Sequence, residues 1–241
     1  MKIRNLFLFI GTIFLLTSCM FTEEIYLNND GSGNYAFNID LSEMMKSMGE
    51  MSLKDSLKES KVLDTIVFFK DILEEYKDSI ATLDKEDKEI IEALKDLKLH
   101  MHVDEEKGEM LMDFKMDFKD ISELKNMEQK IAKAQALSDK KKKDKSMPSN
   151  SDVSYSFKDK TFSRNVSLKD LSEEQLNEIK QASSFLEGGL YKIIYHFESE
   201  IKSVSFDGAQ ISDDKKTMTI EIPMDSIIKN QKLLDFEVKL K

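Results

Sequence analysis

The chain is poor in cysteine, with a single one, Cys19, among its 241 residues. An intramolecular disulfide is therefore impossible, and side-chain packing alone must hold the folded core. Tryptophan is absent, whereas the chain has 14 methionines and 15 phenylalanines. Because methionine adapts its shape to irregular gaps, this composition predicts a methionine-rich, adaptable core.

The chain also has fewer positively charged residues than negatively charged ones. The 36 lysines and arginines are outnumbered by 46 aspartates and glutamates, which gives a formal net charge of −10. An acidic surface of this kind repels phosphate backbones. We therefore expect no nucleic-acid partner.

No apolar run is long enough for a membrane-spanning helix, which needs about 20 residues. The apolar stretch from Leu6 to Leu16 follows Lys2 and Arg4 and precedes small residues, which is the layout of an export signal. The segment from Leu16 to Cys19 reads Leu-Thr-Ser-Cys and resembles the lipobox of bacterial lipoproteins. This resemblance implies cleavage between Ser18 and Cys19, removal of residues 1–18, and a diacylglyceryl group on the Cys19 sulfur. A secretory signal with an incidental cysteine, or an uncleaved anchor, are the alternatives.

An acylated Cys19 would make membrane lipid the first partner of the mature chain, residues 19–241, because two or three acyl chains hold a protein durably on a bilayer. We expect it on the exported side of the cell membrane or the outer membrane. The Glu23-Glu24 pair has a faint likeness to surface-export signals, which leaves the choice of membrane open.

Alternating apolar residues flank an Asp-Gly turn at residues 29–33, and this pattern predicts a β-hairpin. Ile25 and Leu27 should face Tyr35, Phe37 and Ile39. A calcium-binding loop starting at Asp30 would need a glutamate at its twelfth position, where Leu41 stands, so a plain turn is the better interpretation.

Residues 42–96 change to a helical period and are predicted to form a helical insertion. Met44, Met45 and Met48 share one face of a short helix; apolar residues then recur every three or four positions from Val62 to Ile80. Asp84 is placed to cap a further helix. The methionine face is a candidate binding surface for a ligand, although a face of this kind more often packs in the core.

Period two returns at residues 97–118, which predicts a long hairpin with one wet face. His100 and His102 lie on that face and could hold a metal if a third ligand came near. No residue with ligand spacing is visible, and His196 is distant in sequence. We therefore expect no metal and no cofactor.

The rest of the chain alternates helices with hairpins. Asp120 and Glu123 form a capping box, and Ser172 with Gln175 forms another. Residues 138–152 are lysine-rich and predict a flexible loop. Strands are expected at residues 153–157, 162–168, 191–197, 201–206, 218–222 and 236–240. These elements predict one α+β domain, a mainly antiparallel sheet built from hairpins with helical insertions packed on one side.

Three segments resemble the LppM-like group of bacterial lipoproteins: the start from Cys19 to Tyr35, the region 203–214, and the strand after Leu233. The resemblance covers the two ends of the chain, and the helical middle has no match. It implies an α+β domain in which the early hairpin joins C-terminal strands in one sheet. It carries no catalytic residues.

Catalytic motifs are missing as well. The sequence has no Gly-x-Ser-x-Gly elbow, no His-Glu-x-x-His, no Walker loop and no dinucleotide fingerprint. We expect a non-enzymatic envelope lipoprotein that binds a lipid, glycolipid or protein. The alternatives are a structural subunit of an envelope assembly and a hydrolase that uses carboxylates.

Overall fold

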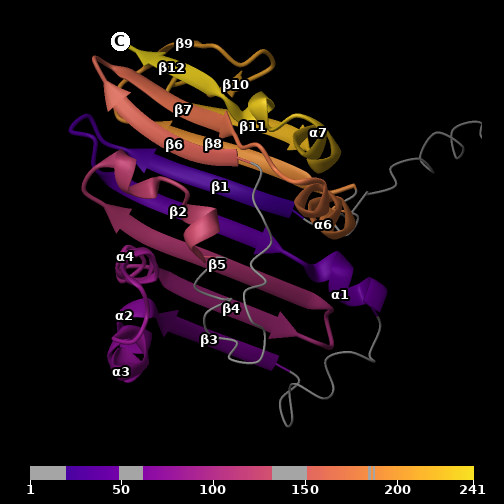
Figure 1. Ribbon diagram of the computed structural model, residues 1–241. Helices are drawn as coiled ribbons and strands as arrows, with labels where there is room; N and C mark the ends of the chain where they lie inside the picture. Colours follow the sequence, from indigo (N-terminus) through magenta and orange to yellow (C-terminus); the bar gives the residue numbers. More distant parts are fainter. Residues whose placement is uncertain (1–19, 49–61, 132–150, 184–185, 187) are drawn as a thin grey trace, which may run out of the picture.

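A computed structural model of the protein describes residues 20–48, 62–131, 151–183, 186 and 188–241, and these form two β-sheets (Figure 1). The strands of the larger sheet are β1 (Met20–Leu27), β2 (Gly33–Asp40), β3 (Val62–Phe68), β4 (Lys98–Asp104), β5 (Glu109–Phe118), β8 (Leu190–Phe197), β10 (Gln210–Ile211) and β11 (Thr217–Pro223). The strands of the smaller sheet are β6 (Ser151–Lys158), β7 (Thr161–Leu168), β9 (Ile201–Val204) and β12 (Phe236–Leu240).

The larger sheet has the order β10-β11-β8-β1-β2-β5-β4-β3, and the smaller one β6-β7-β12-β9. Strand β1 pairs with β8 in parallel, and the other pairs of the described strands are antiparallel. The early hairpin thus shares a sheet with the C-terminal strands β8 and β11, whereas the last strand, β12, lies in the smaller sheet.

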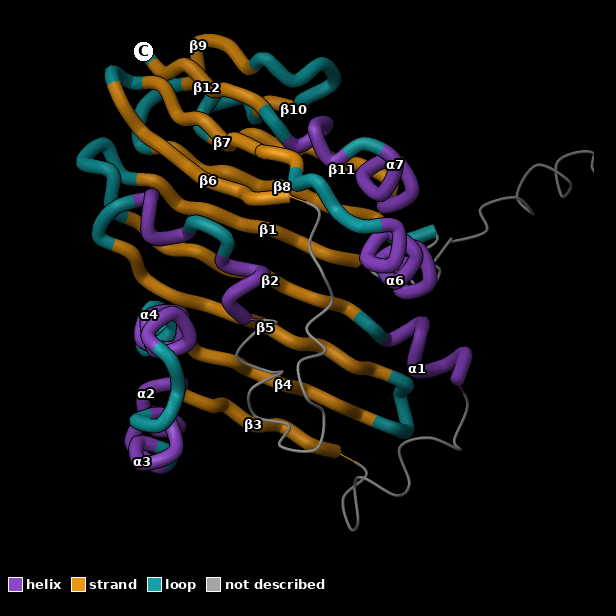
Figure 2. Tube along the Cα trace, in the orientation of Figure 1, coloured by secondary structure: helices purple, strands orange, loops and turns teal. Residues whose placement is uncertain are grey.

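The sequence predicts helical insertions packed on one side of the sheet. The described helices are short, and residues in or next to them, such as Leu94 and Leu124, are buried in the core. These helices are α1 (Ser42–Met48), α2 (Phe69–Glu75), α3 (Lys77–Ile80), α4 (Lys85–Glu92), α6 (Glu173–Ser183), α7 (Met224–Lys229) and the 3₁₀ turns η2 (Ile121–Leu124) and η4 (Gln231–Leu234). Figure 2 shows α2, α3 and α4 at one end of the strands and α1, α6 and α7 at the other. Since most are short and several follow a strand directly, they act as connections between strands.

The hydrophobic core lies between the two sheets. Ile25 of β1, Tyr195 of β8, Phe162 of β7 and Val238 of β12 are all fully buried. The Phe162 ring packs edge-on against Tyr195, with 5.1 Å between centroids. The smaller sheet, rather than helices, is therefore what covers the apolar side of β1 and β8.

Three β-hairpins lie in segments for which the sequence predicts strands. Ile25 lies opposite Tyr35 in the first hairpin, and β4 pairs with β5 in the second. In the third, Asp159 and Lys160 have φ of 50° and 59° and join β6 to β7, which is the left-handed backbone that a tight two-residue hairpin turn requires.

The long helix expected from Val62 to Ile80 is wrong in its first half, because Val62 to Phe68 is strand β3. Its exposure alternates from residue to residue, and it pairs with β4 over its whole length. Val, Thr and Ile at this segment favour an extended backbone, and the pairing outweighs the helical spacing. Helices α2 and α3 account for the second half.

The predicted caps are present. Asp84 accepts a hydrogen bond from the Asp87 amide at the start of α4, and Ser172 and Gln175 bond reciprocally before α6. The box of Asp120 and Glu123 opens a 3₁₀ turn, η2, rather than an α-helix. The lysine-rich residues 138–150 lie outside the described part, and Ser151 and Asp152 already belong to β6.

Candidate functional site

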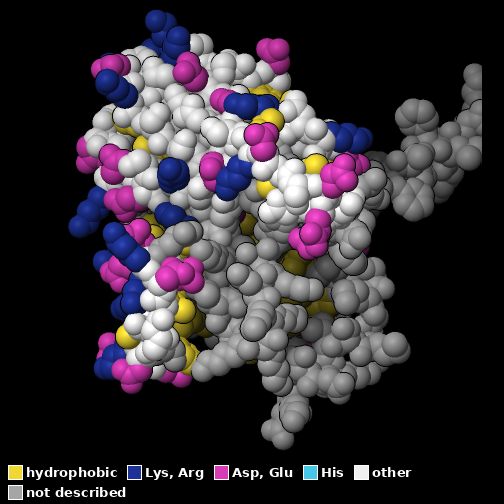
Figure 3. Space-filling model, viewed as in Figure 1, with side chains coloured by type: hydrophobic (Ala, Val, Ile, Leu, Met, Phe, Trp, Pro, Cys, Tyr) yellow, Lys and Arg dark blue, Asp and Glu magenta, His cyan; other side chains and the backbone are white. Residues whose placement is uncertain are grey.

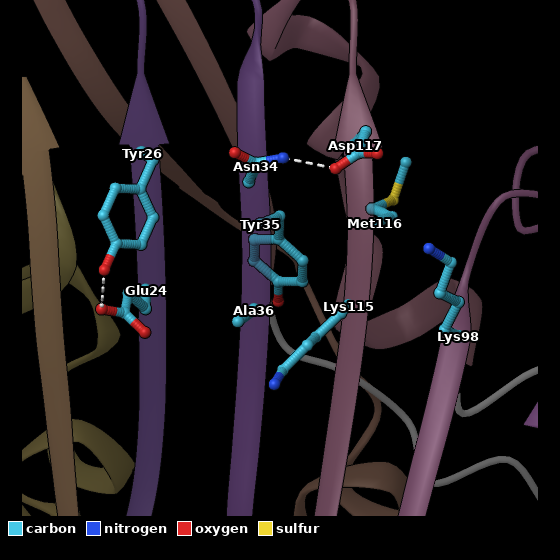
Figure 4. Close-up of a pocket in the computed structure, with 9 residues that line it drawn as sticks. All are labelled: Glu24, Tyr26, Asn34, Tyr35, Ala36, Lys98, Lys115, Met116 and Asp117. Carbon is cyan, nitrogen blue, oxygen red and sulfur yellow. Dashed lines mark hydrogen bonds between the residues drawn. The ribbon is translucent and has the colours of Figure 1, made fainter. Parts of the chain in front are cut away.

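The face of the larger sheet that points away from the smaller sheet, here called the outer face, carries a hollow of about 510 Å³ (Figure 4). Two rows of cross-strand neighbours form its floor: Glu24, Ala36, Lys115 and Lys98 in one, and Tyr26, Asn34 and Asp117 in the other. Tyr35 and Met116 complete the lining. The hollow therefore crosses β1, β2, β5 and β4.

Lys98 and Lys115 lie directly opposite each other on β4 and β5. Like charges at such positions repel each other and destabilise the pairing. Neither lysine forms an ion pair within the described residues, although Lys98 lies 6.0 Å from the ring centroid of Phe68. Figure 4 shows the Lys115 side chain extending toward Ala36 and the Lys98 side chain toward Met116, so each ammonium group is open to an anion in the hollow.

The carboxylates of the hollow already have partners. Glu24 accepts a hydrogen bond from Tyr26 Oη at 3.0 Å and lies 3.0 Å from His196 Nε2. Asp117 accepts a hydrogen bond from the Asn34 amide. The Tyr26 ring stacks on His196, with 4.0 Å between centroids, and the bond to Glu24 raises the pKa of the Tyr26 hydroxyl. These contacts fix an exposed aromatic surface beside the lysines.

The outer face continues into a row of histidines and carboxylates. His100 lies opposite Asp113 on β5, and His102 lies opposite Asp64 on β3. His100 Nε2 is 2.7 Å from Asp64 Oδ1, and hydrogen bonding to Asp64 raises the pKa of His100. The sequence had offered no third group for these histidines, and the pairing of β3, β4 and β5 supplies several. His196 belongs to β8 and contacts Glu24 instead.

A buried polar cluster joins the two sheets at Glu23, which is fully buried. Its carboxylate accepts hydrogen bonds from Tyr155 at 2.8 Å, from Tyr191 at 2.7 Å and from Tyr195, and it pairs with Arg164 at 3.1 Å. Burial by itself would raise the pKa of Glu23. The charge of Arg164 and the tyrosine hydrogen bonds outweigh burial and hold that pKa below the ordinary value.

Arg164 is equally enclosed, with 1% of its surface exposed. It donates to the Leu234 carbonyl at 3.1 Å, while its Nε has no partner within the described residues. A buried ion pair between sheets contributes more to positioning than to stability, because desolvation of both charges offsets their attraction.

Sequence reasoning missed this cluster, since Glu23 was grouped with Glu24 as part of a surface-export likeness. The signal was present in the strand alternation. Phe21, Glu23, Ile25 and Leu27 share one face of β1, so Glu23 had to point inward with them. Arg164, between the inward Phe162 and Val166 of β7, follows the same rule.

Glu128 approaches this cluster from outside. Tyr191 Oη lies 2.9 Å from its carboxylate and donates its single proton to Glu23, so the Glu128 contact is a hydrogen bond when Glu128 is protonated. The residue is exposed on the surface, yet burial of its carboxyl end and the charge of Glu23 raise its pKa. Since Glu23 is sealed from solvent, the two carboxylates do not form an accessible catalytic pair.

The residues predicted for lipid attachment, Ser18 and Cys19, lie outside the described residues, and β1 begins at the next one, Met20. Helix α1 forms as predicted, and Met45 on it is partly buried. The side chains of Met44 and Met48 are outside the described part, so the methionine face remains a prediction. No helix among the described residues is long and apolar enough to cross a membrane.

Comparisons with known proteins do not establish a family for this chain. No family model matches the chain, and no curated protein does so. Among solved structures, the NMR structure of the folded domain of the Mycobacterium tuberculosis protein LppM aligns over 92% of this chain and 89% of its own, at 6% identity and a TM-score of 0.38. That protein bears the name of the group that the sequence resembles. At this TM-score the likeness carries no conclusion, and membership of the group remains a prediction.

Proposed function

We propose that the protein is an envelope lipoprotein, anchored through acylated Cys19 on the exported side of a membrane, whose outer face binds the anionic head group of a lipid. It does so without catalysing a reaction. The observation that supports this most is the pair of opposed lysines, Lys98 and Lys115, in the hollow of the outer face. An anionic group bound there, with both side chains rotated toward it, would reduce their repulsion and gain charge-assisted hydrogen bonds.

The surroundings of the lysines favour a head group over a bare ion. Tyr26 offers an exposed ring beside the lysines, and Asn34 with Asp117 offers hydrogen-bonding groups for hydroxyls. Glycolipid and phospholipid head groups combine an anion with such hydroxyls. The anchor would also keep the site in contact with lipid, which raises the effective concentration of the ligand.

Flotation with vesicles tests this proposal. Since every described element begins at or after Met20, the chain from residue 20 contains all of these elements and lacks Cys19. We expect it to float with phosphatidylglycerol-containing vesicles and not with pure phosphatidylcholine. Exchanging both lysines, Lys98→Ala with Lys115→Ala, should abolish flotation.

Lys192→Ala provides the matched control, because Lys192 also lies on the outer face but pairs with Glu221 at 2.9 Å. That variant should float like the wild type. Equal flotation of the double lysine variant and the wild type would overturn the proposed site.

A second candidate function, a subunit of an envelope assembly, is favoured by the edge strand β3. Ile66 is 60% exposed and Phe68 is 37% exposed on this strand. Exposed apolar side chains on the outermost strand of the described sheet are a typical surface for a protein partner. Crosslinking in the envelope tests it: a partner that crosslinks to the wild type and not to Ile66→Lys would support the assembly role.

A further inference from the structure

Beyond the lysine hollow, we propose that His102, Asp104 and Glu109 form a binding site for a divalent transition metal, for which zinc is a suitable probe. The three residues lie where β4 ends and β5 begins, and Asp104 pairs directly with Glu109. One ligand atom from each lies within 4.8 Å of the other two. The proposal is independent of the lipid-binding role.

The spacing of the ligand atoms suits a metal better than direct hydrogen bonds. His102 Nε2 lies 3.6 Å from Glu109 Oε2, which is too long for a hydrogen bond. Two tetrahedral ligands, each about 2.1 Å from a zinc ion, are separated by roughly 3.4 Å. Small side-chain rotations would therefore place both atoms in the coordination sphere of one ion.

A carboxylate also lies near the second ring nitrogen of His102. This nitrogen, Nδ1, lies 3.5 Å from Asp64 Oδ2 across the strand pair. Metal-bound histidines commonly donate their second N–H to a carboxylate, which fixes the tautomer and the ring direction. At 3.5 Å the Asp64 carboxylate lies just beyond hydrogen-bond distance, and a small rotation would let it accept the Nδ1 proton as a positioning residue while Nε2 faces Glu109.

Asp104 supplies a ligand that is already held in place. It is 4% exposed, and its Oδ1 accepts hydrogen bonds from the amides of Glu106 and Lys107 at 3.0 and 3.1 Å. Its Oδ2 lies 2.9 Å from the ammonium of Lys107, whose side chain is 65% exposed. That ammonium can move into water, so Oδ2 becomes available to an ion without any change in the backbone.

The ligand atoms, one imidazole nitrogen and two carboxylate oxygens, indicate which class of metal would bind. Calcium and magnesium prefer sites made of oxygen ligands, whereas an imidazole nitrogen with carboxylates suits zinc and its transition-metal neighbours. Three protein ligands at the surface of the sheet leave a fourth position for water. The expectation of no metal, drawn from the lack of a third ligand near His102 in sequence, is revised on this geometry.

Calorimetric titration of zinc chloride into the anchored chain, purified in mild detergent, tests the site. We expect one saturable zinc ion per chain. Both His102→Gln and Glu109→Gln should weaken binding by about 100-fold or more, and Asp64→Asn by about 10- to 100-fold. Thermal unfolding should show that each variant is folded.

His196→Gln is the matched control, because His196 is a partly buried outer-face histidine whose nitrogens lie 3.0 Å from Thr217 and Glu24. It should bind zinc like the wild type. Absence of saturable binding, or equal affinity in the wild type and His102→Gln, would overturn the proposal. X-ray absorption of the zinc complex should show nitrogen and oxygen neighbours at about 2.0–2.2 Å.

Discussion

At the residue scale, the most unusual feature of the interior is the charged pair of Glu23 and Arg164, since a charge at the centre of a core is rare unless it is paired. Both are enclosed between the sheets, and three tyrosine hydroxyls complete the hydrogen bonding of the carboxylate. Removing one charge leaves the other buried and unpaired, which costs far more than removing both.

A double-mutant cycle measures this coupling. Glu23→Gln and Arg164→Met should each lower the free energy of unfolding by about 3–5 kcal/mol, because each leaves one buried charge. The combined variant should lose less than the sum, by at least about 1 kcal/mol, since glutamine still accepts hydrogen bonds from the tyrosines. Urea denaturation gives the three values, and simple additivity would contradict the described network.

The same residues predict a pH dependence. The folded-state pKa of Glu23 lies below its ordinary value of 4.5, so the unfolded chain binds more protons in that range. The stabilisation by Glu23 is complete above pH 4.5 and is lost as the pH falls through the folded-state pKa. The combined Glu23→Gln and Arg164→Met variant should therefore show a shallower loss of stability in acid than the wild type.

The pKa of Glu128 is shifted in the opposite direction from that of Glu23, so Glu128 serves as the comparison. Burial raises its folded-state pKa, so its contribution is present at low pH and disappears as the pH rises through that pKa. Glu128→Gln should therefore change the free energy of unfolding more favourably at neutral pH, where the wild-type carboxyl is ionised, than in acid, where it is protonated. Urea denaturation over a pH series separates the two glutamates, and parallel curves for all variants would contradict both assignments.

At the element scale, the hairpins could be predicted because period two is visible within each strand and turn residues separate them. The strand β3 could not, because its spacing also fits a helix and its pairing partner, β4, follows 30 residues later. The outer-face hollow was equally hidden, since its lining comes from four strands. Lys98 and Lys115 meet only once the β4–β5 register is known.

The first hairpin depends on one glycine. A Cβ atom at Gly33 would lie 1.9 Å from the Tyr26 carbonyl oxygen and 2.7 Å from the Phe118 ring. Gly33→Ala should therefore lower the free energy of unfolding by about 3 kcal/mol through overpacking.

Gly208→Ala is the control for that substitution. Gly208 has φ of +89° but no atom within 4 Å of the added Cβ, so the alanine adds only backbone strain of about 1–2 kcal/mol. Thermal or urea denaturation compares the two variants. A smaller loss for Gly33→Ala than for Gly208→Ala would contradict the close approach of Tyr26 and Phe118 to Gly33.

At the scale of the whole molecule, the proposed anchor fixes where the domain sits. Cys19→Ala should block lipid attachment and signal cleavage and release the protein from membranes. Membrane fractionation with a carbonate wash measures this, and Ser32→Ala, a substitution in the first hairpin turn, controls for loss of expression. A Cys19→Ala protein that still sediments with membranes would exclude the lipobox interpretation.

The parallel pairing of β1 with β8 has a consequence for the order of folding. Residue 27 and its partner in β8, residue 197, are 170 positions apart, so this pairing is a long-range contact that slows folding. Until β8 arrives, the first hairpin presents a bare edge to other chains, and a charge in that strand discourages intermolecular pairing. A charged Glu23 makes that edge less suited to pairing with other chains, and Arg164 neutralises the charge once the sheets close.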